Sequence, residues 1–291
     1  PILKPGSTIG VCAPSARFDQ SKFQKGIEII NGLGFRTSVP DDIFLKQRYL
    51  AGNDAQRAAL VNQMFENKQI DAIMTARGGF GAIRVLQYLD WSLIKKHPKP
   101  FIGFSDGTAI LSAIVDRTDI IAIHGPTVVS LSNADPDTLS AFVSLLTQPV
   151  SGVAINFETI VLPGYGKGVL KGGNLATLTS MVGTPYMTDF KGAVLFMEDI
   201  QEPAYKIDRM LTQLRMSGAL DGLSGVVCGT FEKCENDHYL NELLIDMFEF
   251  DRIPVFSGIN CGHGPINRCL PLGGDAELDS RTQTLCVRIR T

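Results

Sequence analysis

Short apolar runs alternate with amphipathic segments throughout the first half of the chain, and this alternation limits the possible folds most strongly. Residues 8–13, 71–76 and 101–104 are short and largely apolar, which is typical of buried strands. Residues 20–33 instead place apolar side chains at spacings of three and four, as an amphipathic helix requires. Strands that alternate with helices indicate a mostly parallel sheet with helices on both faces. The sequence therefore predicts an α/β fold, with its functional site at the carboxyl ends of the strands.

The chain of 291 residues is long enough for two domains. Residues 136–146 predict a helix that closes the first domain. The segment after this helix has little helical pattern and is interrupted by several glycines and prolines. We therefore predict a Rossmann-like N-terminal domain at residues 1–150, a linker at 151–167, and a smaller C-terminal α/β domain at 168–291.

Charge and composition argue against several classes of protein. The formal net charge is −3 and no cluster of Lys and Arg is present, so a nucleic-acid surface is not expected. No apolar run approaches the roughly 18 residues that a membrane-spanning helix needs. The six cysteines form no Cys-x-x-Cys pair and several lie in strand-like runs, which favours buried free thiols in a reducing compartment over disulfides. A leader removed before Pro1 stays open.

One apolar run ends abruptly in Gly103-Phe104-Ser105-Asp106-Gly107, and a helical pattern begins at once. The Gly-x-Ser-x-Gly spacing is that of a nucleophile elbow, in which a serine lies on a tight strand-to-helix turn. Glycine on both sides allows another backbone to come close, and the helix start directs free N–H groups at the serine. The alternative is an ordinary βα turn in which Ser105 or Asp106 only caps the helix.

A serine nucleophile needs a base, and the base needs an orienting carboxylate. We predict His263 as the base, because it follows a predicted strand and has glycine on both sides; His124 is the rival. Glu198 is the preferred carboxylate, because it directly follows a five-residue apolar strand. Asp199 and Glu202 are close rivals, and each of the three acids could instead be a favourable charge at a helix start.

Glycines also follow another strand, in Arg77-Gly78-Gly79-Phe80-Gly81. Such a loop can cradle a phosphate, but the full Gly-x-Gly-x-x-Gly spacing and the Gly-Lys-Ser/Thr motif are both absent. Its free N–H groups could instead supply half of an oxyanion hole, with the N–H of Asp106 as the other half. We expect no metal, because neither His-Glu-x-x-His nor another pair with ligand spacing occurs.

Five separated motifs, read together and in order, resemble the LD-carboxypeptidases, a serine peptidase family that also contains microcin C immunity enzymes. The resemblance covers residues 6–285. The motifs are Arg77-Gly78-Gly79-Phe80-Gly81, Gly103-Phe104-Ser105-Asp106, Gly172-Gly173-Asn174-Leu175, Met197-Glu198-Asp199 with Tyr205-Lys206-Ile207-Asp208-Arg209-Met210-Leu211, and Gly262-His263-Gly264.

The resemblance implies a Ser-Glu-His triad at a junction of two domains. Ser105 is then the nucleophile, His263 the general base and Glu198 its orienter, with an oxyanion hole from the N–H groups of Asp106 and Gly79. The implied reaction removes the terminal D-alanine from murein tetrapeptides, after the L-centre of diaminopimelate or lysine. The resemblance further implies a role in peptidoglycan recycling in the cytoplasm, a homodimer, and no metal or other cofactor.

Two alternatives to this function stay open. One is a microcin C-type hydrolase of peptidyl or aminoacyl adenylates, whose adenine needs an aromatic partner for stacking. The chain has one tryptophan, Trp91, which precedes the candidate nucleophile; between the linker and Glu198 the only large aromatic residues are Tyr186, Phe190 and Phe196. We therefore expect the small peptide substrate. The other alternative is a ligand-binding module without catalysis.

Overall fold

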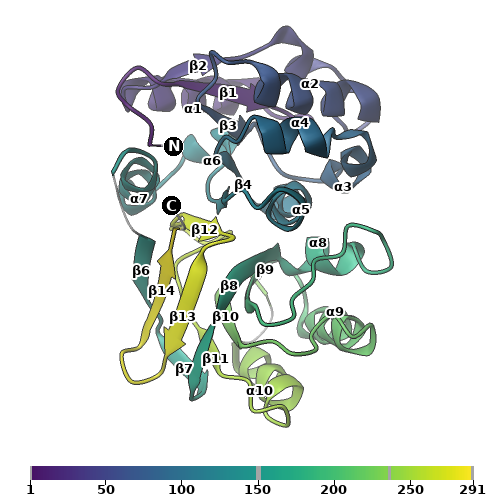
Figure 1. The fold of residues 1–291 in the computed structure, drawn as a ribbon, viewed down its shortest axis with the longest axis vertical. Helices are drawn as coiled ribbons and strands as arrows, with labels where there is room; N and C mark the ends of the chain where they lie inside the picture. The colour runs from purple at the N-terminus through teal and green to yellow at the C-terminus, as the bar shows by residue number, and fades with distance from the viewer. Residues whose placement is uncertain (1, 149–151, 235–236, 290–291) are drawn as a thin grey trace.

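The strands of this computed structural model form two sheets, one in each half of the chain (Figure 1). The structure describes residues 2–148, 152–234 and 237–289. Within them, no helix is both long and apolar enough to cross a membrane. All six cysteines are free, as expected, and four of them are buried.

The first sheet has the order β12-β5-β4-β3-β1-β2, and its neighbours from β5 to β2 pair in parallel. Its strands are β1 (Thr8–Cys12), β2 (Arg36–Ser38), β3 (Ala72–Thr75), β4 (Phe101–Gly103), β5 (Ala122–His124) and β12 (Leu270–Leu272). The helices of this half are α1 (Gln20–Gly32), α2 (Asp54–Glu66), α3 (Ala82–Val85), α4 (Trp91–Lys96), α5 (Thr108–Thr118), α6 (Val128–Leu131) and α7 (Pro136–Thr147). Short 3-10 turns are η1 (Asp41–Phe44), η2 (Leu86–Tyr88) and η3 (Ser105–Gly107).

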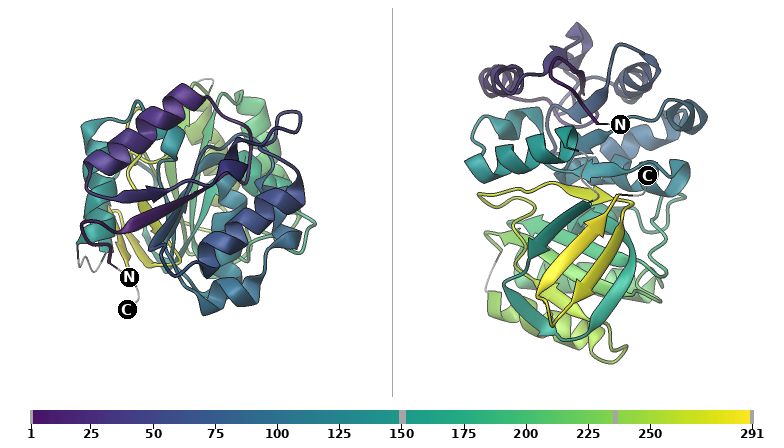
Figure 2. Two further views of the ribbon diagram at one scale, coloured as in Figure 1. Left: turned by 90° about the horizontal axis from the view of Figure 1, so that it is seen from above. Right: turned by 60° about the vertical axis from the view of Figure 1, so that its left-hand side comes forward.

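Helices α1 and α2 lie on opposite faces of the first sheet (Figure 2, left). Helix α1 begins where Asp19 accepts a hydrogen bond from the N–H of Lys22, and it buries Phe23, Ile27 and Ile30. Each such side chain contributes about 1.5–3 kcal/mol of hydrophobic free energy when it is buried. The predicted arrangement, a mostly parallel sheet with helices on both faces, is confirmed.

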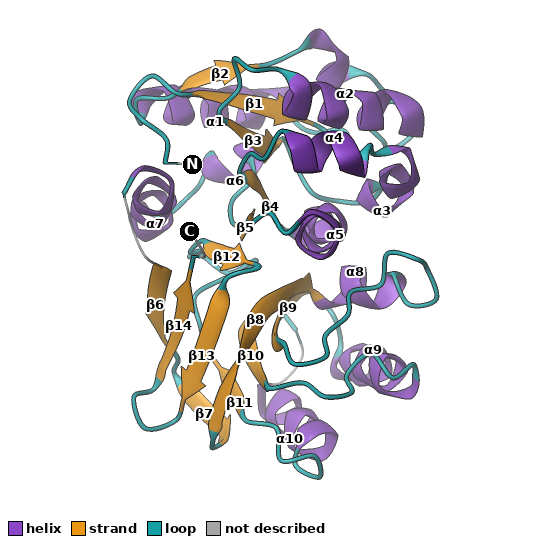
Figure 3. Ribbon diagram, viewed as in Figure 1, coloured by secondary structure: helices purple, strands orange, loops and turns teal. Residues whose placement is uncertain are grey.

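The second sheet has the order β6-β14-β13-β8-β9-β10-β11-β7, and only β8 to β11 are mutually parallel. Its strands are β6 (Gly152–Asn156), β7 (Thr159–Leu162), β8 (Tyr165–Asn174), β9 (Val194–Ile200), β10 (Gly225–Glu232), β11 (Val255–Ser257), β13 (Asp275–Asp279) and β14 (Thr284–Arg288). Its helices are α8 (Leu175–Ser180), α9 (Ala204–Met216) and α10 (Asp237–Phe248). Figure 3 shows these helices beside the parallel strands, while β6, β13 and β14 lie at the other side of this half.

Residues 152–167, within the segment predicted as a linker, form β6, β7 and the start of β8. This finding corrects that prediction. Strands β6 and β7 are the two edges of the second sheet, so each pairs with only one neighbour. Edge strands that are short and half-exposed lack a strong apolar pattern, which explains why their sequence resembles a loop. The predicted boundary between residues 150 and 151 lies outside the described residues.

The two halves also share a sheet. Strand β12 comes from the second half but pairs antiparallel with β5, and Leu270 lies opposite His124. Figure 1 shows β12 between the two halves, and it forms one edge of the first sheet. This exchange ties the loop that carries His263 to the sheet that carries Ser105.

Candidate active site

Ser105 lies on a strained turn between β4 and α5. Its φ angle is 60°, a left-handed conformation that few residues other than glycine adopt. A serine held in this way on a strand-to-helix turn is the hallmark of a nucleophile elbow. Of the two glycines that flank Ser105, Gly103 leaves no room for a side chain, because a Cβ there would lie 2.6 Å from Thr75 Oγ1. A Cβ on Gly107 would meet nothing within 4 Å.

The loop after β3 comes very close to this turn. A Cβ on Gly78 would lie 2.8 Å from Ser105 Cβ and 3.0 Å from its Oγ, so only glycine fits there without a shift. The next residue, Gly79, has a φ angle of 108°. The glycine loop therefore brings backbone N–H groups next to Ser105, where an oxyanion hole needs them.

Asp106 holds that loop with its side chain. The carboxylate is buried, and its Oδ2 accepts a hydrogen bond of 2.8 Å from the N–H of Ala82, at the start of α3. Burial raises the pKa of the Asp106 carboxyl, and hydrogen bonds to it, including the one from Ala82, oppose that shift. The sequence predicted a role only for the backbone N–H of Asp106. Its side chain fixes the distance between the elbow and the glycine loop.

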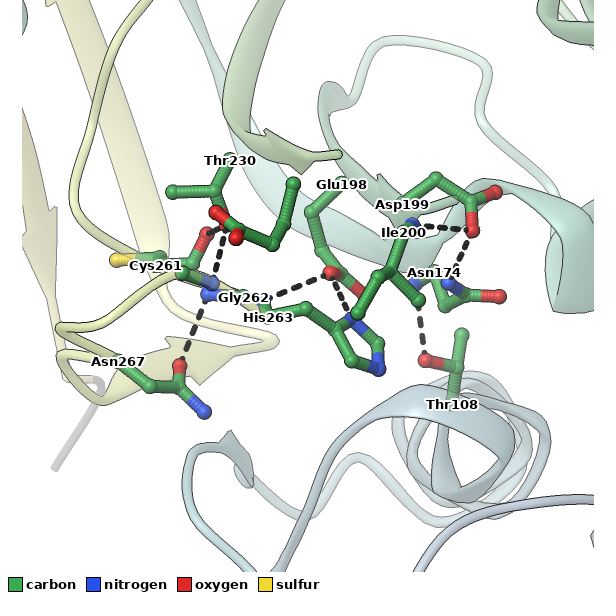
Figure 4. Close-up of polar contacts among 12 residues, drawn as sticks. Thr108, Asn174, Glu198, Asp199, Ile200, Thr230, Cys261, Gly262, His263 and Asn267 are labelled. Carbon is green, nitrogen blue, oxygen red and sulfur yellow. Dashed lines mark hydrogen bonds and ion pairs between the residues drawn. The ribbon is translucent and has the colours of Figure 1, made fainter. Parts of the chain in front are cut away.

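Glu198 and His263 are in direct contact. Glu198 lies on β9 and is fully buried, and its Oε2 is 2.6 Å from His263 Nδ1. The same oxygen accepts a hydrogen bond of 3.2 Å from the backbone N–H of His263. The second ring nitrogen points away from Glu198, toward the ribbon that carries Thr108 (Figure 4). This geometry leaves that nitrogen available to a partner on the N-terminal side.

The loop around His263 is fixed on both sides. The N–H of Gly262 donates to Asn267 Oδ1 at 2.9 Å, and the N–H of Gly264 donates to Thr230 Oγ1 at 3.0 Å (Figure 4). The backbone N–H of Asn267 in turn donates to Thr138 Oγ1 on α7, in the first half of the chain. No sequence motif marks these anchoring residues: Thr230 lies on β10, Thr138 on α7, and Asn267 in the loop after His263.

Gly262→Ala is expected to lower kcat about 100-fold. Gly262 has a φ angle of 118°, and a Cβ there would lie 2.7 Å from Glu198 Oε2. The substitution must move His263 or Glu198, and a displacement of about 1 Å at a reacting group can reduce the rate by that factor. Steady-state assays of hydrolysis measure the effect. Gly32→Ala is the control, because a Cβ at Gly32 meets nothing within 4 Å; equal rates for both variants would contradict the prediction.

Contacts on both sides of Ser105 bring the elbow to this pair. The ring of Phe104 lies 4.8 Å from the ring of His263, measured between centroids. On the other side, Thr108 Oγ1 accepts a hydrogen bond of 3.0 Å from the N–H of Asn174. A Cβ on Gly173 would clash with that threonine, so the glycine permits the close approach. Ser105 thus lies between two contacts that join the halves of the chain.

The two rival carboxylates have other partners. Asp199 accepts a hydrogen bond of 2.9 Å from the side chain of Asn174 (Figure 4). It accepts another of 2.9 Å from the N–H of Ala176. Burial raises the pKa of Asp199 to about 6, against the hydrogen bonds that it accepts. Glu202 instead pairs with Lys206, at 3.4 Å. Asp199 therefore supports the contact between Asn174 and Thr108, and Glu198 is the acid at His263.

The rival histidine, His124, is the last residue of β5 and is fully buried between aromatic rings. Its ring lies 4.8 Å from that of Phe196 and 6.0 Å from that of Phe104. Neither ring nitrogen has a hydrogen-bond partner among the described residues. Burial lowers the pKa of His124 to about 4; the charge of Glu198 opposes this shift and that of His263 adds to it. The structure therefore brings His263, and not His124, to the carboxylate.

His124 is expected to make the protein less stable in acid. In the unfolded chain its pKa returns to about 6.5, so between pH 6.5 and 4 the unfolded state binds a proton that the folded state does not. Its contribution to stability is present above pH 6.5 and is lost as the pH falls to 4, a change of about 3 kcal/mol. Urea unfolding at pH 7.5 and pH 4 measures this change in the wild type and in His124→Gln. An equal pH dependence in both proteins would contradict the assignment.

Within the described ranges, no group of three or more His, Cys, Asp or Glu side chains is arranged to hold a metal ion. The chemistry that the site offers comes from its own hydroxyl, imidazole, carboxylate and backbone N–H groups.

Known proteins are similar to this chain in both of its halves. Residues 9–125 match the LD-carboxypeptidase N-terminal domain family, and residues 167–278 match the LD-carboxypeptidase C-terminal domain family. A probable murein peptide carboxypeptidase of Bacillus subtilis is 34% identical, over 98% of this chain and 92% of its own. The microcin C7 self-immunity protein MccF of Escherichia coli is 28% identical, over 98% and 94%.

Solved structures show the same fold. The crystal structure of muramoyltetrapeptide carboxypeptidase from Oxalobacter formigenes has a TM-score of 0.88 at 30% identity, over 97% of this chain and 99% of its own. The structure of MccF in complex with glutamyl sulfamoyl guanosine has a TM-score of 0.90 at 26% identity, over 99% and 98%.

Proposed function

The chain belongs to the LD-carboxypeptidase family, and from this premise we propose that it is a serine carboxypeptidase that releases the terminal D-alanine from murein tetrapeptides. The observation that carries the proposal is the contact of 2.6 Å between Glu198 and His263, next to an elbow that holds Ser105 at a φ angle of 60°. In this proposal Ser105 is the nucleophile, His263 the base and Glu198 its orienter.

The proposed reaction has two steps. Ser105 Oγ attacks the carbonyl carbon of the scissile bond, while His263 Nε2 accepts the hydroxyl proton. The N–H groups of Gly79 and Asp106 stabilise the resulting oxyanion. His263 then gives its proton to the amine of the departing D-alanine, which leaves the shortened peptide as an ester on Ser105. A water molecule, deprotonated by His263, hydrolyses that ester and restores the serine.

Glu198 acts on the imidazole in both steps. As a buried carboxylate at Nδ1, it holds the ring in the tautomer whose Nε2 can accept a proton. It also stabilises the positive charge that His263 carries after proton transfer. Its second hydrogen bond, from the backbone N–H of His263, resists rotation of the loop.

The three aromatic residues between the predicted linker and Glu198 make other contacts in the structure. Phe190 and Phe196 are buried in the core. Tyr186 packs against Trp91, and the guanidinium of Arg117 lies 4.6 Å from the centre of its ring. These contacts favour the tetrapeptide over the aminoacyl adenylate.

We expect D-alanine release from the L,D-linked tetrapeptide to be at least 10-fold faster, in kcat/KM, than cleavage of either alternative compound. Those compounds are the all-L tetrapeptide and an aminoacyl sulfamoyl-adenylate, and chromatography of the products follows all three reactions. The reason is that discrimination rests on contacts made in the transition state, which differ between an L,D-peptide and an adenylate. Faster cleavage of the adenylate would assign the chain to the microcin-type activity and leave the triad in place.

We also propose that this reaction serves peptidoglycan recycling in the cytoplasm and that the enzyme acts as a homodimer. Both follow from family membership. Light scattering of the purified chain tests the dimer.

A further inference from the structure

A cavity of about 560 Å³ lies beside the glycine loop. Its lining includes three cationic side chains, Arg17, Lys46 and Arg77, and two aromatic rings, Tyr49 and Phe80. We name it the Arg77 cavity. Its volume falls within the range of about 300–1,000 Å³ that is typical of small-molecule sites.

Among the residues that the structure describes, the three cations have no acidic partner. No ion pair in the described part of the chain includes Arg17, Lys46 or Arg77, and no Asp or Glu lines the cavity. The chain as a whole carries a formal net charge of −3. A local cluster of unpaired positive charge on an acidic protein favours an anionic ligand.

The walls of the cavity are held in place by hydrogen bonds between three loops. The N–H of Arg17 donates to the carbonyl of Tyr49 at 3.0 Å, and Arg77 Nη1 donates to the carbonyl of Arg17 at 3.0 Å. The rings of Tyr49 and Phe80 lie 6.0 Å apart. Because these contacts hold the three loops together, binding needs little reorganisation of the backbone.

The cavity reaches the reacting centre through Gly79. This glycine lines the cavity, and its N–H is one of the two proposed oxyanion donors. A ligand in the cavity is therefore continuous with a substrate whose carbonyl oxygen lies in the oxyanion hole. The cavity is also larger than a single alanine residue requires, which favours the peptide upstream of the scissile bond over the departing D-alanine.

We infer that the Arg77 cavity binds the upstream part of the peptide substrate and that Arg17, Lys46 and Arg77 recognise a free carboxylate on it. This inference rests on the proposed function and adds a carboxylate-binding subsite to it. In a murein tetrapeptide with lysine at the third position, the γ-linked D-glutamate supplies the one free carboxylate upstream of the scissile bond, and the terminal D-alanine supplies another downstream.

The test uses Arg17→Met with Lys46→Met in the full chain and compares two tetrapeptides. One has the free D-glutamate carboxylate, and in the other this group is a primary amide. We expect the double variant to lose about 10- to 100-fold in kcat/KM on the free acid, mainly through KM, because hydrogen bonds to a charged group contribute that much. On the amide it should change less than 3-fold. Lys22→Met with Lys25→Met, two exposed lysines on α1 with the same total charge change, is the control and should leave both substrates unaffected.

Three results would overturn the inference. Equal losses in kcat/KM on both tetrapeptides would mean that the cations affect the folded structure or the overall electrostatic field and do not recognise the D-glutamate carboxylate. Unchanged kinetics would mean that the cavity does not touch the peptide. A loss that depends instead on amidation of the terminal D-alanine would move the subsite downstream.

A binding measurement separates this inference from the proposed function. Calorimetric titration of the free-acid tetrapeptide into Ser105→Ala should show Kd rise at least 10-fold when Arg17→Met and Lys46→Met are added. If the wild type released no D-alanine, the proposed function would fail while this titration still tested the subsite. Competition by AMP, lost in the same variant, would make the cavity a nucleotide site and contradict the inference.

Discussion

Ser105→Ala is expected to lower kcat for D-alanine release by at least about 10⁴-fold, with KM nearly unchanged. The substitution removes the only atom proposed to form a bond with the substrate carbonyl, while the glycine loop and the oxyanion donors remain. Loss of a triad member in other serine hydrolases costs this much or more, and the residual rate comes from the oxyanion hole and binding alone.

The fold should tolerate this substitution well. Alanine fills less space than serine beside Gly78, and no buried partner loses a hydrogen bond to Ser105 Oγ among the described contacts. Circular dichroism and thermal unfolding should therefore match the wild type. Ser180→Ala, at an exposed serine on α8, is the matched control and should retain full activity. A Ser105→Ala protein with more than a tenth of wild-type kcat would refute the mechanism.

His263→Ala is expected to lower kcat by a similar factor, because without the imidazole no group accepts the serine proton. The double variant with Ser105→Ala should be hardly slower than either single variant, since the two residues act as one unit. Glu198→Gln should lose less, about 10²- to 10⁴-fold, because the amide still meets the imidazole but no longer stabilises its positive charge. Pre-steady-state and steady-state assays on the three variants give these ratios.

The losses in kcat of the single and double variants show which residues act together. Losses that multiply in the double variant would show that Ser105 and His263 act independently. A rescue of His263→Ala by added imidazole, without rescue of Ser105→Ala, would support the role of base. If His124→Gln were as slow as His263→Ala, the base would have to be reassigned.

The alternating pattern of the first half predicted its sheet because those strands are buried on both faces and read as continuous apolar runs. The same reasoning failed for β6 and β7, whose residues are half-exposed at the edges of the second sheet. The apolar pattern also does not show that β12 (Leu270–Leu272), from the second half of the chain, pairs with β5 in the first sheet. Such a pairing depends on long-range register, which no local pattern records.

Candidates for the site were visible because Ser105 and Glu198 each come soon after an apolar run, and glycines flank the serine and the histidine. In the structure β9 continues beyond that run to Ile200, so Glu198 lies within the strand. The residues alone preferred Glu198 but did not exclude the other two acids. Glu198, Asp199 and Glu202 look alike along the chain, and only the packing of β9 against the His263 loop separates them. The side-chain role of Asp106 and the Arg77 cavity were also hidden, because each joins loops that are far apart in the sequence.

Covalent labelling with a fluorophosphonate tests the assignment of the nucleophile most directly. A hydroxyl that an adjacent base activates reacts with such a probe, whereas ordinary serines do not. We predict one label per chain, mapped by mass spectrometry to Ser105, with activity lost in proportion to labelling and with protection by the tetrapeptide. Labelling should disappear in Ser105→Ala and fall sharply in His263→Ala. Stoichiometric labelling of another residue, or full activity in a chain labelled at Ser105, would contradict the account.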